Sequence, residues 1–158
     1  MLTVVHKGWS GFPLPLSASS RDNPVMDEIE VKRWFDSYLA DFVALGRGEI
    51  DDVWRVFAHY GVPLLLSTDA GCTVLTDETQ VLAVVQQQVD GMRSAGYDRS
   101  DELAAETTVL NHSCATYRAR FARLRADGSE IAQLEATYLI TDRPAGCRIT
   151  AIIVHSAP

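Results

Sequence analysis

The sequence contains few cysteines and no long hydrophobic run. Its three cysteines, Cys72, Cys114 and Cys147, lie far apart and form no C-x-x-C pair. Neither a disulfide framework nor a zinc site is therefore indicated, and free thiols in a reducing cytoplasm are expected. No segment approaches the roughly 18 consecutive apolar residues of a membrane-spanning helix, so we expect no membrane association.

Basic residues are also scarce. Fourteen lysines and arginines stand against 21 acidic residues, which gives a net charge of -7. A chain of this charge repels phosphate backbones and lacks the basic surface of nucleic-acid-binding proteins. Nucleic acid is therefore not an expected partner.

Common catalytic motifs are missing as well. The sequence has no G-x-S-x-G, no glycine-rich phosphate loop and no H-x-x-x-H spacing among His6, His59, His112 and His155. These absences argue against nucleophilic catalysis, nucleotide binding and a histidine metal site. We predict no metal and no cofactor.

The composition is otherwise that of a globular protein, with 47% hydrophobic and 22% charged residues. A chain of 158 residues suits one domain. Residues 1–23 carry many proline, serine and glycine residues and are interpreted as a flexible arm, or as an over-extended start before Met26. Residues 24–158 are predicted to form a single domain.

Three helices are predicted in the first half of this domain. The first follows Asn23 and Pro24 and ends near Gly46 and Gly48, and its apolar residues recur three and four positions apart. These apolar residues are Val31, Trp34, Phe35, Tyr38, Phe42 and Leu45.

The second helix, over residues 49–58, is expected to bury Val53, Trp54 and Phe57. The third begins at Asp77, because Asp77 can cap the helix while Gln80 occupies the capping-box position. The glutamines at 86–88 are expected to face solvent.

Alternating patterns predict β-strands elsewhere. A short hairpin has strands at 62–66 and 72–75 around a polar turn, and four long strands follow at 103–111, 115–125, 130–141 and 147–155. Together, these elements predict an α+β fold, a cone-shaped roll in which three N-terminal helices pack on a curved antiparallel sheet of long strands plus a short hairpin.

The Asp127-Gly128 pair predicts a two-residue turn between the second and third long strands. Such a turn pairs residues whose numbers add to 255, because 127 + 128 = 255. It places three pairs opposite each other: Tyr117 and Tyr138, Arg120 and Glu135, and Leu124 and Ile131. One face of the sheet is then apolar and suited to cover by the helices.

The apolar character of the last strand bears on how the chain assembles. Residues 149–154 are apolar on both faces, whereas the helices are expected to cover only one face of the sheet. A second copy of the chain is the simplest second cover. We therefore expect a homodimer through the outer sheet face.

The order of elements resembles the cone-shaped fold of the nuclear transport factor two-like superfamily, which includes the SnoaL-like and ketosteroid isomerase families. The resemblance covers residues 24–156. It rests on four segments: ALGRGEIDDVWRVFA (44–58), TDETQV (76–81), VLNHSCATYRARF (109–121) and CRITAIIVHS (147–156). These segments mark the fold and are not catalytic motifs. The chain is most similar to superfamily members without a characterised activity.

Ketosteroid isomerases carry a catalytic Asp eight residues after the Phe that ends the second helix. The same count from Phe57 reaches Leu65 in this sequence. The place of that family's oxyanion-hole Tyr is held by Asp41, with Tyr38 three residues earlier. Because leucine cannot abstract a proton, the resemblance does not imply isomerase chemistry of that kind.

The resemblance also implies a pocket between the first helix, the hairpin and the concave sheet face. The residues expected to line it are Trp34, Tyr38, Trp54, His59, Leu65, Tyr117, Tyr138 and His155. Aromatic residues at these spacings also form cores, and His59 could act as a general base or cap the preceding helix. His155 is expected to face inward, an assignment that one residue of error in the 142–146 turn would reverse.

Two functions are consistent with these features. The first is a domain that binds a small apolar ligand in an aromatic pocket, with or without cofactor-free isomerase, lyase or hydrolase activity. The second is a non-enzymatic dimeric binding or interaction module whose cavity is filled by its own side chains. An open cavity of a few hundred Å³ or more, about the size of known ligand sites, would favour the first.

Overall fold

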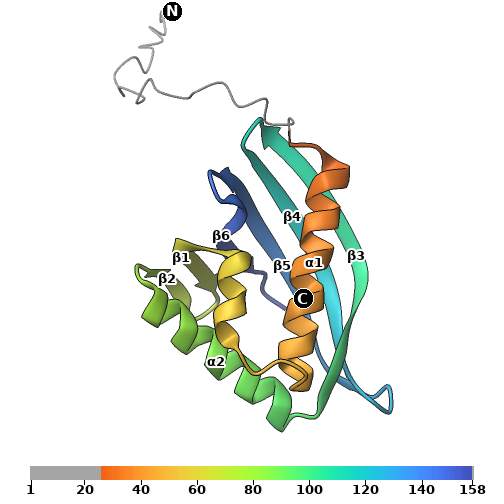
Figure 1. The fold of residues 1–158 in the computed structure, drawn as a ribbon. Helices are drawn as coiled ribbons and strands as arrows, with labels where there is room; N and C mark the ends of the chain where they lie inside the picture. Colours follow the sequence, from red (N-terminus) through yellow and green to blue (C-terminus); the bar gives the residue numbers. More distant parts are fainter. Residues whose placement is uncertain (1–25, 158) are drawn as a thin grey trace, which may run out of the picture.

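The computed structural model describes residues 26–157, so the predicted arm at 1–23 lies outside the described residues. A long helix crosses a curved sheet, and a shorter helix and a helical turn lie beside it (Figure 1). The elements in chain order are α1 (Glu28–Arg47), η1 (Val53–Ala58), β1 (Tyr60–Thr68), β2 (Gly71–Leu75), α2 (Glu78–Ser94), β3 (Tyr97–Asn111), β4 (Cys114–Arg125), β5 (Glu130–Arg143) and β6 (Gly146–Val154). The predicted α+β fold is confirmed.

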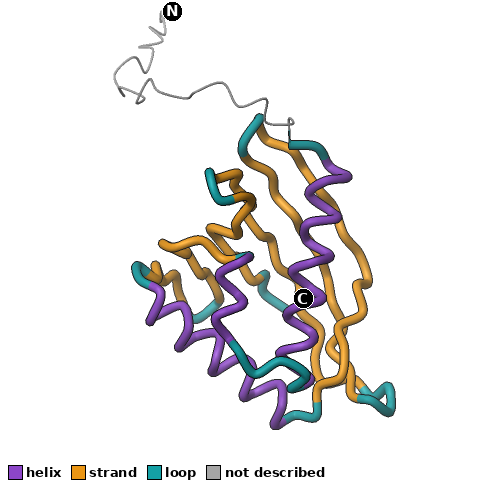
Figure 2. The backbone as a smooth tube through the Cα atoms, in the orientation of Figure 1, coloured by secondary structure: helices purple, strands orange, loops and turns teal. Residues whose placement is uncertain are grey.

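One six-stranded sheet runs through the molecule in the order β2-β1-β6-β5-β4-β3. All neighbouring strands are antiparallel except β1 and β6, which pair in parallel. The hairpin of β1 and β2 therefore extends the sheet of long strands and is not a separate unit beside it. The helices lie on one side of this curved sheet (Figure 2).

The end of α1 and the start of α2 form as the sequence predicts, but α1 begins at Glu28, later than the start predicted after Asn23 and Pro24. The Asp27 carboxylate accepts the Glu30 N–H at 2.8 Å to start α1, and Gly48 ends it in the left-handed conformation with φ 75°. For α2, Asp77 accepts the Gln80 N–H at 3.0 Å while the Gln80 side chain accepts the Thr76 N–H at 2.8 Å. Both caps fix where these helices begin against the sheet.

The second helix differs from the prediction. It is a 3₁₀ helix, η1, that begins only at Val53 and buries Val56. With three residues per turn, Val53 and Val56 share one face, so Trp54 and Phe57 occupy another. Trp54 is 55% exposed, and its ring contacts that of Phe57 at 5.4 Å between centroids. The expected burial of Trp54 is therefore wrong.

The predicted register of β4 and β5 is confirmed over most of its length. Tyr117 pairs with Tyr138 and Arg120 with Glu135. The turn is longer than predicted, because Arg125 and Ser129 close it through the Arg125 N–H and Ser129 carbonyl at 2.9 Å. An extra residue, Ile131, then restores the register, so Leu124 pairs with Glu130 instead.

A bulge also decides the direction of His155. Residues 143 and 146 pair across a two-residue turn, and the same register holds as far as the pair Ile140 and Ile149. Thr150 is then an extra residue, a β-bulge, so Leu139 pairs with Ala151. This bulge moves His155 to the outer face, where its Nε2 lies 2.7 Å from the Thr137 hydroxyl. The expected inward direction of His155 is wrong.

Strand β3 begins at Tyr97, six residues earlier than its predicted start at 103. Its first residues are polar, but Arg99 forms ion pairs with Asp98 and Asp101 at the sheet edge. Such charged residues are tolerated on an edge strand, where one side of the strand has no neighbour. No helix between residues 26 and 157 has the length and apolar character needed to cross a bilayer.

Candidate functional site

A cavity of about 460 Å³ lies between the helices and the concave face of the sheet. Tyr38 and Phe42 line it from α1, Val84 from α2, and Leu66 from β1, with further residues from β3 to β6. A volume of this size falls in the range of known ligand pockets, about 300–1,000 Å³. The cavity is therefore large enough for a small organic molecule.

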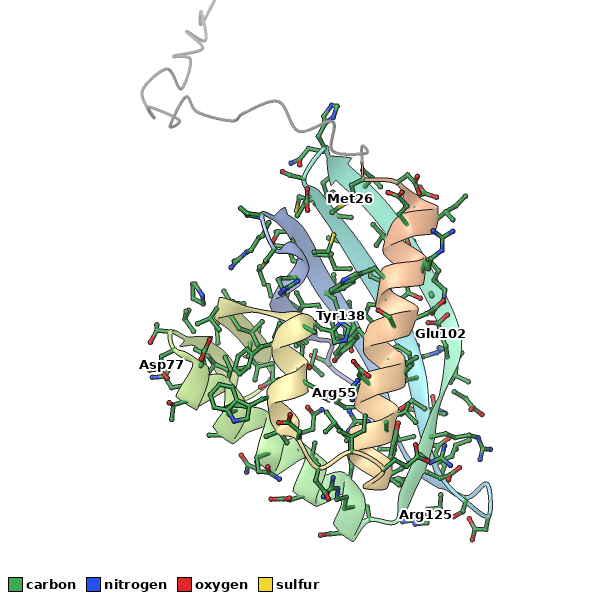
Figure 3. The ribbon with its side chains drawn as sticks, in the orientation of Figure 1. Met26, Arg55, Asp77, Glu102, Arg125 and Tyr138 are labelled. Atoms are coloured by element: carbon green, nitrogen blue, oxygen red, sulfur yellow. The ribbon has the colours of Figure 1, made fainter. Side chains whose placement is uncertain are left out.

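Three tyrosines place hydroxyl groups at this cavity. Tyr38, Tyr60 and Tyr138 come from α1, β1 and β5, and Figure 3 shows Tyr138 between α1 and the sheet. The Tyr38 and Tyr60 hydroxyls lie 2.7 Å apart and share a hydrogen bond. The Tyr138 hydroxyl makes no hydrogen bond to another described residue, so it remains available to a ligand.

Burial keeps these phenols protonated. It raises the pKa of Tyr60 to about 12, and it raises the pKa of Tyr38 and of Tyr138 further above the ordinary value. The positive charge of Arg123 opposes this effect on the pKa of all three. At neutral pH the tyrosines are therefore hydrogen-bond donors and not bases.

The remaining polar lining residues come from α2, β1, β3 and β4, with Thr68 at the end of β1. Arg123 and Ser100 pair across β4 and β3 and both line the cavity. Gln87 and Gln88 also line it; Gln87 is exposed, as predicted for the glutamines at 86–88, whereas Gln86 and Gln88 are half-buried. None of the described lining residues is Asp, Glu or His, so the cavity walls offer hydrogen-bond donors and one cation but no carboxylate or imidazole base.

The eight candidate pocket residues separate into several places. Only Tyr38 and Tyr138 line the large cavity. Tyr117 lies under α1, where its ring stacks on Phe35 at 3.9 Å between centroids and its hydroxyl donates to the Glu102 carboxylate at 2.7 Å. Trp34 instead borders a smaller hollow of about 130 Å³.

The other four lie away from the cavity. Trp54 is exposed on the outside of η1. Leu65 pairs with Ala151, and because side chains alternate along a strand it lies on the opposite face from its neighbours Leu64 and Leu66, which line the cavity. His155 is on the outer sheet face, as described above. His59 does not line the cavity and contacts Asp41.

His59 neither caps η1 with its ring nor reaches a tyrosine hydroxyl. Its Nε2 lies 2.9 Å from the Asp41 carboxylate, and its Nδ1 is buried without a hydrogen-bond partner. Arg55 reaches the other oxygen of Asp41 at 3.4 Å. Asp41 of α1 therefore contacts both Arg55 of η1 and His59 directly after it, and these contacts hold η1 against α1.

Sequence reasoning missed the polar part of the cavity. Ala115, Tyr117, Ala119 and Phe121 alternate along β4 as inward residues, and Arg123 is the next position in that series. A charged residue that continues an apolar alternation is the signal that could have identified it. Within residues 26–157, no group of three or more His, Cys, Asp or Glu side chains is arranged to hold a metal ion.

The helices pack on one face of a curved, mostly antiparallel sheet, and a cavity lies between the two layers. This arrangement is the α+β cone fold of the NTF2-like, or cystatin-like, class. The sequence matches the family described as NTF2-like protein (DUF6841) over residues 27–157, and the chain belongs to that family. A search of curated proteins gives no match.

Several solved structures share the fold. A putative calcium/calmodulin-dependent protein kinase II association domain from Xanthomonas campestris is 16% identical, with TM-score 0.59, covering 89% of this chain and 96% of that one. An NTF-2-like protein of unknown function from Shewanella oneidensis is 16% identical, with TM-score 0.58, covering 80% and 99%. An NTF2-like protein from Novosphingobium aromaticivorans is 14% identical, with TM-score 0.58, covering 80% and 81%. At these identities the similarity establishes the fold alone.

Proposed function

We propose that this protein binds a small, mainly apolar molecule in the cavity between α1, α2 and the concave sheet face. The open volume of about 460 Å³ carries the proposal. It disfavours the alternative of a module whose cavity is filled by its own aromatic side chains. The tyrosine hydroxyls supply a few polar groups in an otherwise apolar lining, which is the usual composition of a ligand site.

Binding is better supported than acid-base catalysis. No Asp, Glu or His is among the cavity-lining residues of the part of the chain that the structure describes, and the buried tyrosines have raised pKa values. A general base needs a pKa near the working pH and hydrogen-bond reach of the substrate. The geometry therefore supports a binding domain in preference to an isomerase, lyase or hydrolase.

A cavity-filling variant tests the proposal. Val84 lines the cavity from α2, whereas the adjacent Ala83 is exposed and does not. Val84→Trp should occupy the cavity, and Ala83→Trp adds an indole to the same helix outside it. Titration with the neutral probe naphthalene-2-carboxamide should show saturable binding to the wild type and Ala83→Trp, and none to Val84→Trp. No saturable binding to the wild type, or equal binding to all three proteins, would contradict the proposal.

We also propose that the outer sheet face forms a homodimer. Ile153 lies on that face with 41% of its surface exposed, opposite Thr137 of β5. A shallow hollow bordered by Ala104, Arg118 and Glu135 adjoins it on the same face. An exposed aliphatic residue beside polar side chains is consistent with an interface that a second copy would cover.

Light scattering at micromolar concentration tests the dimer. The wild type should show twice the chain mass, and Ile153→Asp should lower the mass toward that of one chain because it places a carboxylate in the apolar part of the interface. Ile29→Asp is a matched control, since Ile29 is exposed on α1, away from the outer face. A monomeric wild type would rule out this part of the proposal.

A further inference from the structure

Arg123 is the one permanently charged side chain among the described residues that line the cavity. It is half-buried on β4, and its guanidinium lies over the ring of Phe42 at 5.7 Å from the centroid. Such a cation–π contact does not provide a hydrogen-bond acceptor for the five N–H donors of the guanidinium. The question is what those donors bind.

Within residues 26–157, the Arg123 side chain has neither an ion pair nor a hydrogen bond to an acceptor. Two other arginines of the fold do have partners. Arg125, two residues along β4, donates to the Ala95 carbonyl at 2.9 Å. Arg93 donates to the Leu45 carbonyl at 2.9 Å and pairs with Asp51 at 3.2 Å. A partly buried charge is normally paired, so the free donors of Arg123 indicate a site for an acceptor from outside the chain.

The charge distribution around the cavity favours an anion. The chain has 21 acidic residues and a net charge of -7, yet no Asp or Glu is among the described lining residues. The Tyr138 hydroxyl also has no hydrogen-bond partner among the described residues and remains protonated at neutral pH, so it is a second donor. The local lining therefore favours a negatively charged ligand, although the net charge of the chain is negative.

From these observations we infer that the ligand is an organic acid, with one carboxylate bound by Arg123 and an apolar body between the tyrosines and the aliphatic walls. This inference rests on the proposed binding function and specifies its ligand class. A guanidinium presents parallel N–H donors that match the two oxygens of a carboxylate, which makes arginine suited to this role. The apolar remainder of the cavity excludes small, fully hydrated anions.

Two probes of nearly equal shape test the inference. Naphthalene-2-carboxylate carries the charge and naphthalene-2-carboxamide does not. The wild type should bind the carboxylate about tenfold more tightly than the carboxamide, as expected for hydrogen bonds to a charged group. Arg123→Gln should remove that preference, so that the two probes bind the variant with equal affinity, and native circular dichroism shows that the variant is folded.

Arg120→Gln is the matched control. Arg120 lies on the same strand but lines the hollow of the outer face, so its loss changes the net charge equally without changing the cavity. It should keep the tenfold preference. Arg123→Lys should keep part of it, because lysine retains the charge but lacks the paired donors.

The outcomes separate the two proposals. Equal binding of both probes to the wild type overturns the carboxylate assignment and leaves the binding function standing. A preference that survives in Arg123→Gln also overturns it. If neither probe binds the wild type, both the assignment and the binding function are contradicted. Loss of the preference in Arg123→Gln alone supports the assignment to Arg123.

Discussion

The hydroxyl groups of Tyr38 and Tyr60 lie 2.7 Å apart in the buried part of the molecule and join α1 to β1. Each of the two residues is only 5% exposed. The pair forms one polar wall of the cavity. Its hydrogen bond therefore contributes to both the position of α1 and the chemistry of the cavity.

The first prediction concerns this pair. Tyr60→Phe should lower the free energy of unfolding by about 1–2 kcal/mol, because it leaves the buried Tyr38 hydroxyl unpaired. The double variant Tyr38→Phe/Tyr60→Phe should cost less than the sum of the single variants, since both polar groups are then gone. Urea unfolding of the four proteins measures this coupling, and additive costs would show that the two hydroxyls do not interact.

The second prediction concerns high pH. Burial raises the pKa of Tyr60 to about 12, above the ordinary value of 10.0 that applies in the unfolded chain. The stability that this shift supplies is present below pH of about 10 and is lost as the pH rises through about 12. The free energy of unfolding should therefore fall over this window, by up to about 3 kcal/mol from Tyr60 alone, and less steeply in Tyr60→Phe.

Tyrosinate absorbance gives an independent check. All five tyrosines have raised pKa values, with burial as the main cause. At pH of about 10, where a free tyrosine is half ionised, the folded protein should show little tyrosinate. Substantial tyrosinate absorbance with native circular dichroism at that pH would contradict the buried positions.

The third prediction concerns His59 and Asp41. Asp41→Ala should destabilise the protein by about 1–3 kcal/mol, because Nε2 of the buried His59 loses its partner at 2.9 Å while Nδ1 already has none. Asp36→Ala is the control, since Asp36 pairs with Lys32 on the surface of the same helix. That change should cost less than about 1 kcal/mol. If thermal unfolding shows the same destabilisation in Asp41→Ala and Asp36→Ala, the buried contact between His59 and Asp41 contributes no more to stability than the surface ion pair.

The fourth prediction compares two helical glycines. A Cβ atom at Gly46 would lie 2.7 Å from two carbon atoms of the Tyr97 ring, so Gly46→Ala should destabilise the protein by about 1–3 kcal/mol. At Gly91 a Cβ atom meets nothing within 4 Å. Gly91→Ala should therefore stabilise the protein by up to about 1 kcal/mol through its helix propensity. Chemical unfolding of both variants tests the contrast, and a shift of the same sign in both would contradict it.

The strand pairings show how far the sequence could predict the fold. Asp127-Gly128 predicted the register of β4 and β5 correctly, yet the turn is one residue longer than assumed and Ile131 compensates for it. In β5 and β6 the bulge at Thr150 has no such compensation, so the direction of His155 came out reversed. A bulge leaves the alternating pattern on either side intact, so periodicity alone does not reveal it.

The candidate site was predicted only in part for similar reasons. Tyr38 and Tyr138 could be placed at the cavity because α1 and β5 are long, regular elements with clear apolar faces. Trp54 was misplaced because a 3₁₀ helix turns side chains to different faces than an α-helix does. Arg123 continues the apolar alternation of β4, which places it on the inner face, but that pattern does not show whether an acceptor from another strand or helix lies nearby.

A crystal structure of the protein with naphthalene-2-carboxamide tests the central proposal most directly. The account predicts the probe inside the cavity, between Tyr38 and Tyr138, with Phe121 and Val84 against its apolar faces. A cavity closed by rearrangement of its own aromatic side chains, with the probe absent or on the outer surface, would contradict the proposed binding function.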